Sequence, residues 1–96
     1  MFARVTTVYL PDAASSTEIL RVHERLYASL KKFHGFRDYI ALVNRKSGEA
    51  KGIILWESKD AMAVHHESII ALLSRIGVDL NTTPQKIEDY EVAFHT

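Results

Sequence analysis

The sequence places its one tryptophan close to two of its five histidines. His65 and His66 follow Trp56 by nine and ten residues. Imidazole has a pKa near neutrality, which suits it to act as a general base or as a hydrogen-bond partner for a ligand. An indole ring nearby would add an aromatic surface. We therefore take His65 as the candidate catalytic residue, with Trp56 and His66 as candidate substrate contacts.

A second pair of candidates, His23 and Tyr27, lies one turn apart on a predicted helix. If two helices cover the same face of a sheet, His23 and His65 face the same space from two walls. A mostly apolar space with a few convergent polar groups is what a small-molecule site requires. The alternative is that these side chains only pack, because a tryptophan at a strand end buries a large area whatever the function.

Metal and cofactor chemistry have little support in the sequence. The chain has no cysteine, which excludes disulfides, thiolate metal sites and cysteine nucleophiles. The stretch His66–Ile70 begins like the HExxH zinc motif but has Ile70 where the second histidine must stand. Adjacent helical residues diverge by about 100°, so His65 and His66 cannot easily share one ion. We predict neither a metal site nor a cofactor.

Composition indicates one ordinary domain spanning residues 1–96. Twelve basic and twelve acidic side chains cancel, and 47% of the residues are hydrophobic. Nucleic acid and anionic membrane are therefore not expected as partners, since binding to phosphate groups needs a basic field. Residues 1–5 lack the apolar core of a signal peptide, and no run is long enough for a membrane helix, so a cytoplasmic location is the expectation.

The elements that must position these residues follow from hydrophobic period and turn residues. A capping box at Ser15 and Glu18 opens a first helix that Gly35 ends, and Ser58 is the predicted N-cap of a second helix that runs to about Ile76 before Gly77. Four strands are predicted, over residues 2–10 before Pro11-Asp12, 36–43, 50–56 and, after the turn at 81–84, 86–95. The order βαββαβ predicts an α+β, ferredoxin-like fold with a four-stranded antiparallel sheet and both helices on one face.

The middle strands bear on assembly. Phe36, Ile40 and Leu42 are predicted on one face of the sheet and Tyr39 on the other, and the stretch Ile53–Trp56 is apolar throughout. Two helices cover one face only, so the other needs a second cover. A second copy of the sheet is the economical one, which predicts a homodimer through the sheet face.

Four stretches of the chain resemble a known superfamily. They are His34–Arg37, Leu42–Gly48, Leu55–Ser58 followed by an alanine-rich helix, and Ile87–Val92. In this order they resemble the dimeric α/β-barrel superfamily, and most closely its antibiotic biosynthesis monooxygenase-like branch. The resemblance implies a homodimer whose sheets face each other, with a pocket between sheet and helices in each subunit. Its better-known members oxidise polycyclic aromatic or quinol compounds without metal or flavin, and relatives degrade haem.

The chain departs from these patterns at the positions that carry chemistry. The monooxygenase pattern has an asparagine four residues before the strand tryptophan, where this chain has Gly52. The haem-degrading pattern has a ring-contacting tryptophan and an iron-binding histidine where this chain has His65 and Ser74. Two hypotheses result: cofactor-independent oxidation of a small aromatic or quinol, and a non-catalytic homodimer that binds a small apolar ligand or serves as an interaction module.

Overall fold

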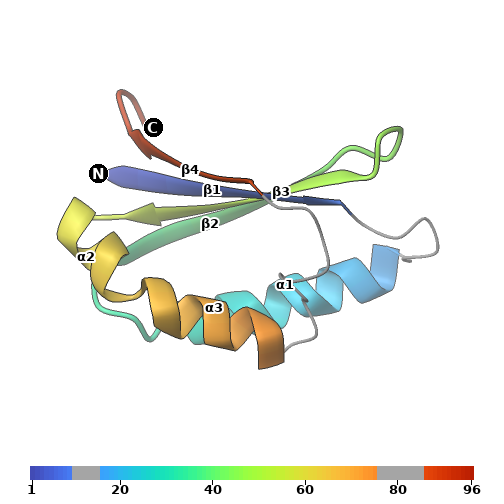
Figure 1. Ribbon diagram of the computed structural model, residues 1–96, viewed down its shortest axis with the longest axis horizontal. Coiled ribbons are helices and arrows are strands. Elements are labelled where there is room, and N and C mark those ends of the chain that lie inside the picture. Colours follow the sequence, from blue (N-terminus) through green and yellow to red (C-terminus); the bar gives the residue numbers. More distant parts are fainter. Residues whose placement is uncertain (10–15, 76–85) are drawn as a thin grey trace.

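The structure is a computed structural model that describes residues 1–9, 16–75 and 86–96. Its elements are β1 (Phe2–Tyr9), α1 (Ser16–Leu30), β2 (Phe36–Val43), β3 (Glu49–Trp56), α2 (Lys59–Val64), α3 (His66–Arg75) and β4 (Lys86–Glu91). The strands form one antiparallel sheet in the order β2-β3-β1-β4. Figure 1 shows all three helices on one side of this sheet. The ferredoxin-like fold predicted from the sequence is confirmed.

Several predicted signals lie outside the described residues. These are the Pro11-Asp12 turn, the capping box, which needs Ser15 and the side chain of Glu18, the stop at Ile76-Gly77, and the turn at 81–84.

The β2–β3 hairpin has the predicted strands and a turn organised by Asn44. Its side-chain Oδ1 accepts hydrogen bonds from the backbone N–H of Lys46 (3.0 Å) and of Ser47 (3.3 Å). Gly48, with φ of 76°, then returns the chain to β3. Asn and Gly are favoured there because one closes the turn with its side chain and the other adopts positive φ without strain.

A bulge at the start of β2 corrects one predicted position. The sequence placed Phe36 on the face of Ile40 and Leu42, by strict alternation. The register shifts between Phe36 and Asp38, so that Phe36 pairs with Trp56 while Ile40 pairs with Ile53. An extra residue in a strand reverses the facing of what precedes it. Phe36 therefore lies on the helix side, edge-on to Trp56 at 6.2 Å between ring centroids.

The second predicted helix is interrupted, which is a second correction. It begins after Ser58 as predicted, but α2 ends at Val64, His65 takes φ −96° and ψ 1°, and α3 starts at His66. The His65 ring is held by contacts outside its own helix, with Trp56 and the His34 carbonyl. His65 thus lies at the junction of two helices, with its ring toward the Trp56 end of β3.

The last strand is shorter than predicted, ending at Glu91 and not at His95. Glu91 pairs with Phe2, the first residue of β1, so β1 has no further residue with which β4 could pair. One further hydrogen bond joins the Val92 N–H to the Met1 carbonyl at 3.0 Å. Beyond it the Phe94 side chain is 84% exposed.

The core lies between the helices and the sheet. Among the described residues it contains seven buried side chains from α1, β3, α2 and α3: Leu26, Leu30, Ile54, Trp56, Met62, Ile69 and Leu72. Trp56 is 1% exposed and Leu30 fully buried. Residues on the helix side of the sheet are thus positioned by a packed apolar layer.

Candidate functional site

The junction after Trp56 is built by a helix cap. The Ser58 hydroxyl accepts a hydrogen bond from the Ala61 N–H at 3.1 Å, and Asp60 lies in the first turn of α2. Serine at an N-cap satisfies a backbone donor that the helix leaves open, and an acidic side chain favours the positive end of the helix dipole. The predicted N-cap at Ser58 is confirmed. The cap fixes where α2 starts relative to the end of β3.

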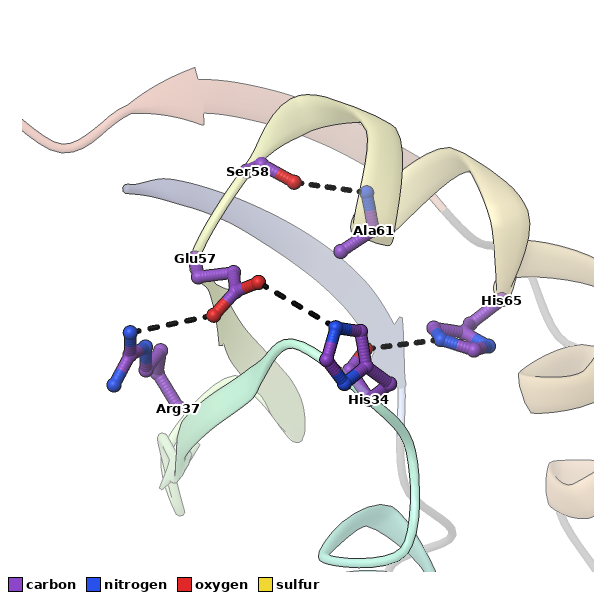
Figure 2. A network of polar contacts seen from close by, with 6 residues as sticks. All are labelled: His34, Arg37, Glu57, Ser58, Ala61 and His65. Atoms are coloured by element: carbon purple, nitrogen blue, oxygen red, sulfur yellow. Dashed lines mark hydrogen bonds and ion pairs between the residues drawn. The ribbon is translucent and has the colours of Figure 1, made fainter.

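His65 lies between two aromatic rings at the break between α2 and α3. Its ring stacks on Trp56 at 5.4 Å, with 23° between the planes, and contacts Phe33 at 4.9 Å. Its Nε2 is 3.0 Å from the backbone oxygen of His34, a contact drawn in Figure 2. A carbonyl only accepts, so Nε2 carries the proton in this contact. Any action of neutral His65 as a base would have to use Nδ1.

A surface ion cluster lies beside this junction. Glu57 makes an ion pair with Arg37 at 3.3 Å and approaches His34 Nε2 at 3.9 Å, as Figure 2 shows. His34 is 93% exposed, and exposed pairs of this kind contribute about 0 to 1 kcal/mol. The cluster therefore belongs to the surface and supplies no buried charge to a site.

Trp56 belongs to the core, with a row of aromatic rings leading away from it. Phe36 lies edge-on to Trp56, and Tyr27 lies edge-on to Phe36 at 6.1 Å. Tyr27 is 43% exposed, and the Lys31 ammonium lies 5.1 Å from its ring centroid. Of these two candidate substrate contacts, Tyr27 and Trp56, only Tyr27 has an accessible ring, because Trp56 is enclosed in the core.

His23 forms a hydrogen bond with Tyr39, which the sequence did not single out as a site residue. Its Nδ1 lies 2.6 Å from the Tyr39 hydroxyl, and the two ring centroids are 5.8 Å apart. Tyr39 is half-buried against the core, on the helix side of β2. A methyl group at Gly52, on the neighbouring strand, would lie 3.5 Å from the Tyr39 oxygen. Glycine therefore leaves one flank of the phenol without a side chain.

Burial keeps both members of this pair neutral. Desolvation lowers the pKa of His23 and raises the pKa of Tyr39 to about 12. Both shifts have the same physical cause, since removing a group from water disfavours its charged form. Near pH 7 the pair is therefore a neutral imidazole facing a protonated phenol.

His66 lies in a separate cluster with Arg4 and Asp89. Arg4 makes two hydrogen bonds to the Asp89 carboxylate, at 2.7 and 3.0 Å, and approaches His66 Nδ1 at 2.6 Å. Guanidinium only donates, so His66 accepts here through Nδ1. The hydrogen bond from Arg4 lowers the pKa of Asp89. The cluster joins β1, β4 and the start of α3, and it occupies His66 in a structural contact.

The structure thus groups the candidates differently from the sequence. It brings Trp56 together with His65, His23 with Tyr39, and His66 with Arg4. Tyr39 and Arg4 were missed as site residues. The signal for Tyr39 was a tyrosine on the helix side of one strand with Gly52 on the next, and the signal for Arg4 was a charged residue inside a predicted strand.

Two further features of the described residues concern metal ligands and helix length. Within residues 1–9, 16–75 and 86–96, no group of three or more His, Asp or Glu side chains is arranged to hold a metal ion. In the same ranges, no helix is both long and apolar enough to cross a membrane.

Comparisons with known proteins give structural relatives only. The sequence matches no model of a protein family and no curated protein. A variant of SnoaB, a cofactor-independent oxygenase from Streptomyces nogalater, superposes with TM-score 0.73 at 13% identity, covering 98% of this chain and 94% of that one. The monooxygenase ActVA-Orf6 of Streptomyces coelicolor, in complex with nanaomycin D, gives 0.73 at 14% identity, with 99% and 89% covered.

The haem-degrading protein MhuD from Mycobacterium tuberculosis, with two haems bound in its active site, gives TM-score 0.72 at 18% identity. The superposition covers 100% of this chain and 99% of MhuD. Identities this low establish the fold and leave the chemistry to be argued from this chain's own residues. The chain has the ferredoxin-like fold that antibiotic biosynthesis monooxygenases also have.

Proposed function

We propose that this protein is a homodimer that binds a small aromatic or quinol compound on the helix side of its sheet and oxidises it with dioxygen, without metal or flavin. The observation that carries the proposal is His23. It is half-buried, held neutral by desolvation, and directed at the helix side of the sheet through its contact with Tyr39. A neutral imidazole in such a place is a general base. The likeness to SnoaB and ActVA-Orf6 supports the proposed reaction class.

The proposed reaction needs a base and no redox group in the protein. Removal of a proton from an anthrone-type substrate leaves the electron pair on the ring system as an enolate. The enolate transfers electrons to dioxygen, one oxygen atom ends as the new carbonyl, and the other leaves as water together with the two hydrogens of the oxidised carbon. The role of the protein is to bind the substrate, take the proton and return it.

His23 is better placed than His65 to be this base. The Nε2 of His65 donates to the His34 carbonyl, and its ring is enclosed by Trp56 and Phe33. The test is oxygen uptake with anthrone and with a naphthoquinol, using wild type, His23→Gln and His65→Ala. We expect a loss of about 100-fold in His23→Gln, in the range of general-base effects, and a smaller loss in His65→Ala. A wild-type rate no greater than that of buffer would refute the proposed oxidation.

The proposed dimer is formed through the sheet face opposite the helices. Register places Tyr9, Ile40, Leu42 and Tyr90 on that face, each between 40% and 50% exposed. Exposed apolar side chains on an otherwise uncovered sheet face favour an interface, and the identical face of a second copy matches it in character.

Sedimentation tests the dimer with two variants that add the same charge. Wild type should sediment as a species of about twice 10.9 kDa at micromolar concentration. Leu42→Glu should shift the protein toward monomer, whereas Val64→Glu, at a 74% exposed position on α2, should not. A wild type that is monomeric at that concentration would contradict the proposed assembly.

A second candidate function is ligand binding without catalysis. Gly52 favours it, because the monooxygenase pattern has an asparagine at this position and the glycine contributes no polar group. This candidate predicts saturable binding of an aromatic probe together with no oxygen uptake. Trp56, the only tryptophan, supplies the fluorescence signal for the titration.

A further inference from the structure

The geometry points to Tyr39 as the residue that contacts an oxygen atom of the substrate, with His23 behind it as the positioning residue that takes up the proton. This inference rests on the proposed function, since it assigns the contact group of the same site. It also specifies the ligand: a ring compound that carries a phenol or a carbonyl oxygen.

The position of the Tyr39 hydroxyl supports this role. The hydroxyl lies on the helix side of the sheet, with His23 of α1 at 2.6 Å. Position 52 on the adjacent strand has no side chain, and even a methyl group there would only come into van der Waals contact, at 3.5 Å from the oxygen and 3.6 Å from Cε1. The phenol thus packs over the backbone of Gly52, where any larger side chain would crowd it, and is bonded to His23. Both members of the pair are only partly buried, and the ligand approaches the hydroxyl from this partly exposed side.

Hydrogen-bond capacity explains why both redox forms of such a ligand would fit. A tyrosine hydroxyl has one donor and also accepts, and the bond with His23 uses only one of these functions. When His23 Nδ1 accepts, the Tyr39 oxygen remains free to accept from a phenol O–H. When Nδ1 carries the proton and donates, the Tyr39 O–H remains free to donate to a carbonyl. The same two residues can therefore hold a quinol before oxidation and a quinone after it.

Deprotonation of the substrate involves only three groups: the substrate, Tyr39 and His23. The substrate O–H bond breaks and its proton joins the Tyr39 oxygen, while the original Tyr39 proton moves to His23 Nδ1. The products are a substrate phenolate, a neutral tyrosine and an imidazolium. No electron leaves the substrate in this step, and the His23 proton later returns to the reduced dioxygen.

The neutral ground state of the pair favours a relay over a tyrosinate base. Burial raises the pKa of Tyr39 to about 12, so the free phenolate form is scarce near pH 7. Coupled transfer to His23 avoids forming that species. The imidazolium that results is opposite in charge to the substrate phenolate, which offsets part of its desolvation cost.

The test uses two probes that differ in their oxygen atoms. Anthraquinone-2-sulfonate carries two carbonyl oxygens, and anthracene-2-sulfonate has the same ring frame without them. Dissociation constants are measured by quenching of Trp56 fluorescence, for wild type, Tyr39→Phe, His23→Gln and the control Tyr9→Phe, which removes a hydroxyl at a 49% exposed position on the opposite face. Circular dichroism shows whether each variant is folded.

We expect Tyr39→Phe to weaken anthraquinone-2-sulfonate binding by roughly 3- to 10-fold, the range for loss of one neutral hydrogen bond. Binding of anthracene-2-sulfonate should not change, and Tyr9→Phe should match wild type with both probes. A purely structural Tyr39 would weaken both probes equally, and that result would overturn the inference. If Tyr39→Phe bound both probes with the same dissociation constants as wild type, that result would overturn the inference as well.

The pH profile assigns the role of His23. In wild type, kcat/KM for the naphthoquinol, which carries the O–H bond that breaks in this step, should fall as pH drops through the pKa of His23, which burial lowers from its ordinary value. His23→Gln keeps a hydrogen-bonding side chain beside Tyr39 but does not titrate, so its residual activity should lack that acid limb. If the acid limb of the pH profile were the same in His23→Gln as in wild type, His23 would not be the group that takes up the proton.

The outcomes separate this inference from the proposed function. Selective weakening of the anthraquinone probe in Tyr39→Phe, with no oxygen uptake by wild type, would retain the contact residue and refute the oxidation. Oxygen uptake that is equal in wild type and Tyr39→Phe would refute the contact residue and retain the oxidation. Failure of wild type to bind either probe would overturn both.

Discussion

Substitution of Gly35 by alanine is expected to be one of the most damaging single-methyl changes in the described part of the chain. Gly35 has φ of 88°, a left-handed conformation that costs an alanine about 1 to 2 kcal/mol. Its new Cβ would lie 2.6 Å from the Cβ of Ala61, about 1 Å inside normal contact between carbon atoms. Ala61 cannot yield easily, because its N–H is bonded to the Ser58 cap at 3.1 Å. Overpacking of this kind costs about 1 to 3 kcal/mol.

The two effects together predict a loss of about 2 to 5 kcal/mol in the free energy of unfolding. The measurement is urea unfolding at one fixed protein concentration, since a dimer unfolds in a concentration-dependent way. Gly48→Ala is the matched control, with φ of 76° in the β2–β3 turn, and it should lose only the conformational part of about 1 to 2 kcal/mol. Equal losses in the two variants would refute the packing of α2 against the start of β2.

Two further predictions concern pH and helix capping. Because the hydrogen bond from Arg4 lowers the pKa of Asp89, this carboxylate stabilises the fold above the pKa of an unfolded aspartate, about 3.9, and that contribution is lost as pH falls through the folded value. The Tm difference between wild type and Asp89→Asn should therefore shrink as pH is lowered from 6 to 3, and a difference independent of pH would contradict this explanation. Ser58→Ala should lower the free energy of unfolding by about 1 kcal/mol through loss of the α2 cap. Ser68→Ala, exposed within α3, should change it by no more than a few tenths. Equal effects in the two serine variants would show that the cap is not what Ser58 contributes.

The regular elements were predictable because their causes are local. The period of the apolar residues, Ser58 as N-cap, and the turn at Asn44 and Gly48 each depend on neighbours in sequence. The predictions were wrong where a contact between residues far apart in the sequence determines the local backbone. The bulge places Phe36 on Trp56, and the helix break places His65 between Trp56 and the His34 carbonyl. Local propensity carries no information on such contacts.

The candidate site was predictable in part, for the same reason. Helical spacing correctly placed His23 on the inner side of α1, but its partner Tyr39 is 16 residues away on a strand. Spacing along the chain carries no distance between His23 and Tyr39, so Tyr39 was not predicted as a site residue. His66 was assigned to the site by its proximity to His65, whereas Arg4, 62 residues away, determines where it lies. Contacts between a helix residue and a strand residue far away in the sequence are the information that the sequence lacks.

The most direct test of the account is a crystal structure of the protein with anthraquinone-2-sulfonate. We predict the ring system between the helices and the sheet, with one carbonyl oxygen about 2.7 Å from the Tyr39 hydroxyl and His23 still bonded behind it. A ligand bound on another surface, or on the helix side without an oxygen contact to Tyr39, would contradict the account.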